Sequence, residues 1–207
     1  MPIQLPADLM VSVSGLRGLV GAPLTPELMA GVAAAFGAFV RHRKPDAPVV
    51  VGRDSRTSGP MFRNAVVAGL QSVGVDVIDL GIVPTPTVLL AVQHHGAAGG
   101  LAITASHNPA EWNALKLVSH EGTFLDADDA LSFRTHLTEG EVTRASWHAL
   151  GEVRTDDEAV DRHLEALLAC ELVDLDAIRA ARLHVALDCV RGAGGVLEPM
   201  AGKPVDE

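Results

Sequence analysis

A hydroxyl, an imidazole and an amide stand side by side in the run Ser106-His107-Asn108-Pro109. The run follows Gly100–Thr104, a short apolar segment that is typical of a buried strand. Open α/β sheets place ligands at the carboxyl ends of their strands, and Pro109 disfavours helix at the residue before it, so a loop is expected here. Such a loop could present the Ser106 hydroxyl to a phosphoryl donor. The same residue types also form ordinary turns, and their spacing leaves both interpretations open.

Two other segments place arginine beside glycine or at a strand end. In Ser14-Gly15-Leu16-Arg17-Gly18, the backbone can approach a ligand closely, and the guanidinium can hold phosphate oxygens through two parallel hydrogen bonds. The alternative is an exposed arginine in a glycine turn. Gly52-Arg53-Asp54-Ser55-Arg56 follows a run of three valines. There we favour a pair between Arg53 and Asp54 that orders the loop.

Together these segments occur in the order and approximate spacing of the α-D-phosphohexomutases, and the chain resembles the N-terminal portion of that family. The segments are Gly15-Leu16-Arg17-Gly18, Gly52 to Arg56, Pro84-Thr85-Pro86, Thr104 to Pro109, and Trp112-Asn113-Ala114-Leu115-Lys116. The resemblance is strong over residues 11–125 and weaker over residues 150–195. The Ser-Gly-x-Arg-Gly and Ser-His-Asn-Pro details look most like phosphoglucosamine mutases. Phosphoglucomutases and phosphomannomutases share nearly all of these features.

The resemblance implies an enzyme that interconverts hexose 6-phosphate and hexose 1-phosphate through a phosphoserine and a bisphosphorylated sugar. Ser106 matches the residue that carries the phosphoryl group. Arg17 and Lys116 match cations beside it, with Lys116 assisting proton transfer, and His107 belongs to the same catalytic set. Three further residues are implied to position the substrate or its phosphate: Asn108, Asn113 and Arg56.

The family also uses Mg²⁺. Its ligands are the phosphoserine oxygen and three aspartates of an Asp-Gly-Asp-x-Asp-Arg loop in the second domain. Ser106 would supply one ligand through its phosphate, and the aspartate loop does not occur in this sequence. The cluster Asp126, Asp128 and Asp129 lacks the glycine turn of that loop, and we interpret it as the N-terminal cap of a helix. The chain is therefore expected to be an incomplete fragment without turnover, whether a natural truncation, a frameshift product or a deliberately shortened protein.

The elements that must position these residues alternate between helix and strand. Helices are expected to begin at Thr25-Pro26, Ser58-Gly59 and Thr85-Pro86, where hydroxyl caps and early prolines favour helix starts. Strands are expected over residues 48–52, 75–80, 100–104 and 114–118. This alternation predicts a three-layer α/β/α domain with a mixed, mostly parallel sheet.

Two domains are expected. Residues 1–150 form the domain with the phosphoserine loop, and residues 151–207 form a partial second α/β unit that ends before the metal-binding loop. In the second unit we expect helices near residues 157–172 and 174–181 and a buried strand over Leu183–Asp188.

The composition excludes several classes of protein. The net charge of −10, without a run of basic residues, argues against partners such as nucleic acid and anionic membranes. The only cysteines, Cys170 and Cys189, form no paired motif and fit a reducing compartment. The N-terminus lacks the pattern of a signal peptide, and the longest apolar run, Leu28–Val40, is too short to span a bilayer. We therefore expect a cytoplasmic protein, and the family resemblance implies hexose phosphate and hexose 1,6-bisphosphate as its partners.

Three other functions are compatible with parts of the sequence. Ser106 adjoins His107, as a serine hydrolase would need, but the Gly-x-Ser-x-Gly elbow is missing. The glycines at 192, 194 and 195 suggest a nucleotide-binding turn, but Leu197 occupies the place of its last glycine. The third alternative is a non-catalytic module. Its incomplete second unit would expose strand residues such as Val185 and Leu187 and promote self-association or pairing with a partner.

Overall fold

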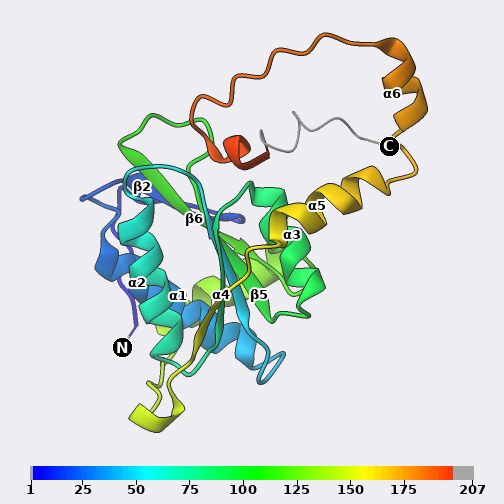
Figure 1. Cartoon of the computed structure of the whole chain (residues 1–207). Helices are drawn as coiled ribbons and strands as arrows, with labels where there is room; N and C mark the ends of the chain where they lie inside the picture. The colour runs from blue at the N-terminus through cyan, green and yellow to red at the C-terminus, as the bar shows by residue number, and fades with distance from the viewer. Residues whose placement is uncertain (1, 198–207) are drawn as a thin grey trace.

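The computed structural model describes residues 2–197 and arranges them around one mixed sheet of seven strands (Figure 1). The strands are β1 (Met10–Ser12), β2 (Gly15–Leu19), β3 (Val49–Arg53), β4 (Val77–Ile82), β5 (Gly99–Ile103), β6 (Trp112–Val118) and β7 (Val153–Thr155). Their order across the sheet is β1-β2-β6-β5-β3-β4-β7. The neighbours β5-β3, β3-β4 and β4-β7 are parallel. The neighbours β1-β2, β2-β6 and β6-β5 are antiparallel. The predicted mixed sheet is confirmed, but it is not mostly parallel, because the described strands form three parallel and three antiparallel pairs.

Helices cover both faces of this sheet. One face packs against α1 (Pro26–Arg41), α2 (Gly59–Gln71) and α4 (Ala127–Glu139), and the other against α3 (Thr85–His94) and α5 (Ala159–Leu168) (Figure 1). The short helices are η1 (Trp147–Ala149), α6 (Leu175–Ala181) and η2 (Ala193–Leu197). No helix in the described part of the chain is long and apolar enough to cross a membrane. The architecture is the predicted three-layer α/β/α fold.

The two layers of helix explain why the central strands are apolar throughout. Successive side chains of a strand point to opposite faces, so Val49 and Val51 join the core cluster under α1 and α2, while Val50 joins the cluster under α3. All three side chains are completely buried. A strand covered on both faces therefore needs the continuous valine run that the sequence shows.

The expected helix starts are confirmed in position, but of the expected hydroxyl caps only Thr25 accepts a capping hydrogen bond. Asp126 and Asp174 cap α4 and α6. Thr25 Oγ1 accepts a hydrogen bond of 3.2 Å from the Leu28 amide at the start of α1. Asp126 Oδ1 accepts one of 2.8 Å from the Asp129 amide at the start of α4. The Asp129 carboxylate also pairs with Arg43 at 2.5 Å. The capping interpretation of the acidic cluster is therefore confirmed.

The expected strand over Leu183–Asp188 is wrong for the part of the chain that the structure describes. These residues belong to no strand, and the side chains of Leu183, Val185 and Leu187 are 68%, 80% and 58% exposed. The segment runs outside the body of the molecule after α6 (Figure 1). An apolar alternation forms a strand only when a neighbouring strand supplies its hydrogen bonds, and no described strand lies beside this one.

Three strands outside the expected ranges, β1, β2 and β7, also belong to the sheet. β2 contains the segment that was read as a glycine-rich loop, and β7 continues the sheet beyond residue 150 by pairing with β4. The boundary placed between residues 150 and 151 stays a prediction, but β7 and α5 after it pack against the first 150 residues. Residues 198–207 of the expected second unit lie outside the described residues.

Candidate functional site

The Ser106 loop begins where β5 ends. Ser106 has a φ of 57°, in the left-handed region that residues with a side chain rarely adopt. Its amide donates to Thr104 Oγ1 at 3.1 Å, and the Asn108 amide donates to the Ala105 carbonyl at 3.1 Å. Ser106 and His107 are exposed, with 3.4 Å between Ser106 Oγ and His107 Nδ1. The loop therefore leaves the serine side chain accessible at the carboxyl end of a central strand.

The register of β2 and β6 brings Arg17 and Lys116 onto one face of the sheet. Gly15 lies opposite Lys116 and Arg17 lies opposite Ala114, and residues two apart in a strand point to the same side. Arg17 Nη1 donates a hydrogen bond of 2.8 Å to Asn108 Oδ1 in the Ser106 loop. Arg17 thus lies on a strand and contacts the loop, so the alternative of an exposed arginine in a glycine turn is wrong.

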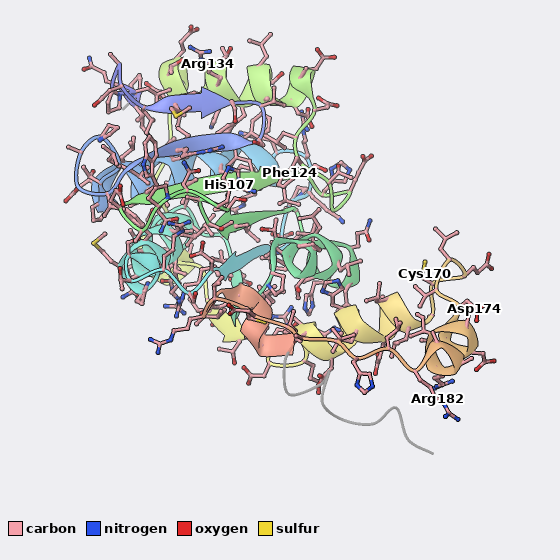
Figure 2. The ribbon with its side chains drawn as sticks, turned by 90° about the horizontal axis from the view of Figure 1, so that it is seen from above. His107, Phe124, Arg134, Cys170, Asp174 and Arg182 are labelled. Carbon is pink, nitrogen blue, oxygen red and sulfur yellow. The ribbon has the colours of Figure 1, made fainter. Side chains whose placement is uncertain are left out.

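Lys116 lies in partly buried surroundings. Burial, and then the positive charge of Arg17, lower the pKa of Lys116 from its ordinary value of 10.5. Its Nζ lies 5.4 Å from the centroid of the Phe124 ring, a cation–π distance. Arg134 on α4 lies beside β1, at the edge of the sheet (Figure 2). An amine of lowered pKa exchanges protons more readily near neutral pH than a free lysine does.

The lowered pKa predicts how stability changes with pH. The unfolded chain holds the Lys116 proton up to about its ordinary pKa, whereas the folded chain loses it at lower pH, so the folded state binds fewer protons in between. The lysine therefore destabilises the fold at neutral pH, and this cost is relieved as the pH rises from the folded pKa towards 10.5. We expect Lys116→Met to be more stable than the wild type at neutral pH, with a gap that narrows in alkaline buffer. Urea unfolding of both proteins across this pH range measures the difference in their free energies of unfolding. A difference that does not change with pH would show that the lowered pKa of Lys116 is not its cause.

Arg56 does not reach towards a ligand as the sequence analysis expected. Its guanidinium donates hydrogen bonds to Asp54 Oδ2 and to the carbonyls of Ser106, Asn108, Pro109 and Trp112. These bonds account for all five of its N–H donors, so none is left for a substrate phosphate. The expected pair between Arg53 and Asp54 is wrong as well, because Asp54 pairs with Arg56 at 3.0 Å. Arg53 instead donates to the Asp54 backbone carbonyl.

Asn113 is likewise used inside the protein. It is completely buried, and its Nδ2 donates to Ser58 Oγ at 2.8 Å, while its Oδ1 accepts from the Ala114 amide at 2.8 Å. The residue ties β6 to the start of α2 and has no exposed surface for a substrate. The sequence did not identify Thr104 or Ser58 as residues that hold the site together through hydrogen bonds. A hydroxyl residue two positions before Ser106 was a usable signal, since Ser and Thr often hydrogen-bond a backbone amide two residues on.

A small hollow lies at the centre of this arrangement. It has a volume of about 20 Å³ and is lined by residues that include Arg17, Thr104, Ser106 and Lys116. That volume holds about one water-sized group, so a phosphoryl oxygen fits and a whole sugar does not. A hexose phosphate would therefore have to lie above the hollow, against surfaces other than its walls.

The described residues do not by themselves fit a magnesium site. Among residues 2–197, no group of three or more His, Cys, Asp or Glu side chains is arranged to hold a metal. Mg²⁺ prefers carboxylate and phosphate oxygens, and the Asp54 carboxylate behind the loop is engaged by Arg56.

Comparison with known proteins places this site in a family. The family described as phosphoglucomutase/phosphomannomutase, alpha/beta/alpha domain I, matches residues 9–143. A phosphoglucomutase/phosphomannomutase of Thermococcus kodakarensis is 39% identical over 186 residues, which cover 89% of this chain and 40% of the relative. A phosphoglucosamine mutase of Levilactobacillus brevis is 36% identical, with 86% and 40% covered.

A solved structure agrees with the sequence matches. The crystal structure of a phosphoglucomutase/phosphomannomutase family protein from Burkholderia thailandensis superposes with a TM-score of 0.63 at 28% identity. The superposition covers 77% of this chain and 36% of the other. The chain spans about 40% of the length of the curated relatives it matches. The matched range contains β2, the Ser106 loop and β6, and the chain belongs to the phosphoglucomutase/phosphomannomutase family.

Proposed function

We propose that this chain provides the phosphoryl-carrying part of a phosphohexomutase, with Ser106 as the residue that holds the phosphoryl group. The observation that carries the proposal is the exposed Ser106 hydroxyl, which a fixed loop holds beside the cations Arg17 and Lys116. The names of the relatives support a mutase acting on hexose phosphates.

The chemistry moves one phosphoryl group between oxygens. The bond from phosphorus to Ser106 Oγ breaks as a sugar hydroxyl of the hexose phosphate bonds to phosphorus and loses its proton. The resulting bisphosphate returns its other phosphoryl group to Ser106. Such transfers pass through a loose transition state with charge spread over the phosphoryl oxygens, which nearby cations stabilise. Arg17 supplies that charge. Lys116 in its neutral form, which a lowered pKa favours, is suited to accept the sugar proton, and it becomes a second cation as it does so.

The neighbours of Ser106 would position the transferred group. His107 Nδ1 lies close enough to Ser106 Oγ to orient an oxygen, and Asn108 links the loop to Arg17. Mg²⁺ enters this proposal only as an ion bound to the phosphate, where it would neutralise charge, and no step of it depends on a described carboxylate.

We propose a hexosamine phosphate as the substrate class and hexose 1,6-bisphosphate as the activating partner. The Ser-Gly-x-Arg-Gly opening and the Ser-His-Asn-Pro loop favour this choice. Glucose and mannose phosphates are the second candidates, since a relative of similar identity carries the name phosphoglucomutase/phosphomannomutase. Relative rates of product formation from the three sugar phosphates would decide between them.

Mass spectrometry of the protein incubated with glucose 1,6-bisphosphate tests the phosphoryl-carrying role. We expect one added phosphoryl group in the peptide that contains Ser106, and none in Ser106→Ala. Ser132→Ala on the exposed side of α4 is the matched control and should be labelled as the wild type is. Labelling of another residue, with the Ser106 peptide unmodified, would show that Ser106 is not the acceptor.

A second candidate function is a module that self-associates. The observation that favours it is the exposed apolar row of Leu183, Val185 and Leu187, which a second copy of the segment could cover by strand pairing. Light scattering over a range of concentrations tests this candidate. We expect the wild type to have a mass above that of the monomer and Val185→Lys to have the mass of the monomer. A wild type that is monomeric at every concentration would exclude self-association.

A further inference from the structure

The Arg56 side chain is enclosed by the segment that carries Ser106. Its Nη2 donates to the carbonyls of Ser106 at 2.9 Å and of Asn108 at 2.7 Å. Its Nη1 donates to the carbonyls of Pro109 at 2.7 Å and of Trp112 at 3.1 Å. One side chain from the end of β3 thus binds four backbone carbonyls within seven residues of the loop. The planar guanidinium fork is well suited to this, because its donors diverge in fixed directions.

Asp54 fixes the orientation of that fork. Its Oδ2 accepts from Arg56 Nε at 3.0 Å, and its Oδ1 accepts from the Arg56 backbone amide at 3.1 Å. The two side chains are only 13% and 14% exposed, so water screens this pair weakly. The carboxylate therefore holds the guanidinium from behind while its other four donors face the loop.

The loop needs such a hold because of the backbone at Ser106. A φ of 57° costs a serine energy relative to the right-handed region, and the surrounding contacts must outweigh that cost. The bond from the Asn108 amide to the Ala105 carbonyl is the one backbone hydrogen bond between residues 104–109. The remaining order comes from Thr104, Arg17 and, with the most bonds, Arg56.

We propose that Arg56 and Asp54 are positioning residues that hold Ser106 in its left-handed conformation, and with it the direction of the serine oxygen. Neither residue contacts the reacting atoms. Their importance for phosphoryl transfer rests on the proposed function, whereas their effect on the loop does not. Lysine cannot replace Arg56, because an ammonium has three donors that cannot reach five acceptors arranged around a planar fork.

The experiment compares Arg56→Lys and Asp54→Asn with Arg63→Lys. Arg63 on α2 pairs with Asp79 at 2.6 Å and makes no bond to the loop, so it controls for the loss of an arginine–aspartate pair. NMR coupling of the Ser106 amide and α protons reports its φ, and hydrogen exchange of residues 105–112 reports the order of the loop. We expect both site variants to lose the left-handed signature and to exchange about tenfold faster or more in this segment, since bonds to charged groups are lost. Arg63→Lys should leave both readings unchanged.

Several results would overturn the proposal. The left-handed φ and slow exchange could persist in Asp54→Asn, which keeps the shape of the side chain and serves as the second test if Arg56→Lys fails to fold. Equal loosening of the loop in Arg63→Lys would indicate general destabilisation instead. Labelling from glucose 1,6-bisphosphate forms a separate arm, in which we expect about tenfold slower uptake in the two site variants. Absence of labelling in the wild type would count against the proposed function and leave the NMR result to decide the positioning role.

Discussion

Replacing Arg17 by glutamine should slow the labelling of Ser106 by glucose 1,6-bisphosphate about 100- to 1000-fold, the usual loss when one stabilising donor is removed from a transition state. Arg17 is one of two cations that share a face beside the serine, and it also donates to Asn108 in the loop. Glutamine keeps a polar side chain but removes the charge that the phosphoryl oxygens need. The time course of the mass increase, followed at saturating bisphosphate, measures the effect.

Two further variants separate charge from geometry in this prediction. Arg17→Lys restores the charge without the bidentate fork, and we expect a rate between those of Arg17→Gln and the wild type. Arg154→Gln is the matched control, because it removes an exposed arginine from β7, at the opposite edge of the sheet. Wild-type labelling by Arg17→Gln would show that the arginine does not act on the phosphoryl group. Equal slowing by Arg154→Gln would point to a general effect of net charge.

Local signals predicted most of the helices and the central strands. Thr25 followed by proline marks the start of α1, and Gly74 and Gly96 adopt a positive φ just after α2 and α3, where glycine commonly ends a helix. The valine run of β3 is covered on both faces, as its composition indicated. These features depend on neighbours a few residues apart, and such interactions can be read from the order of residues.

Features that depend on distant partners were missed. The segment Gly15–Leu19 reads as a turn because of its glycines. It is a strand in the sheet because β6, almost 100 residues later, pairs with its whole length, while β1 pairs with part of it. Arg56 was recognised as a useful cation, but its four carbonyl partners lie 50 or more residues away. The sequence shows which donors exist, whereas the fold decides which acceptors surround them.

The same dependence on distant partners gives the largest expected effect on stability, at Gly15. Its φ is 134°, and a methyl group added there would overlap the carbonyl oxygen of Leu115 on β6. Backbone on both sides of the contact cannot move as a flexible side chain would. We expect Gly15→Ala to lower the free energy of unfolding by about 3 kcal/mol or more, from the strain of the positive φ together with the overlap. Urea denaturation, with the slope checked for two-state behaviour, measures the loss.

Gly21→Ala separates the two causes. Gly21 also has a positive φ, 97°, but a methyl group there would meet no atom within 4 Å, so only the backbone strain remains. We expect a loss of about 1 kcal/mol for this control. Since Gly15 lies opposite Lys116, a shift of β2 would also move Arg17 relative to that lysine, and labelling of Ser106 should fall in Gly15→Ala and not in Gly21→Ala. Equal losses of stability in the two variants would mean that the close approach of β2 to β6 is not what requires glycine at position 15.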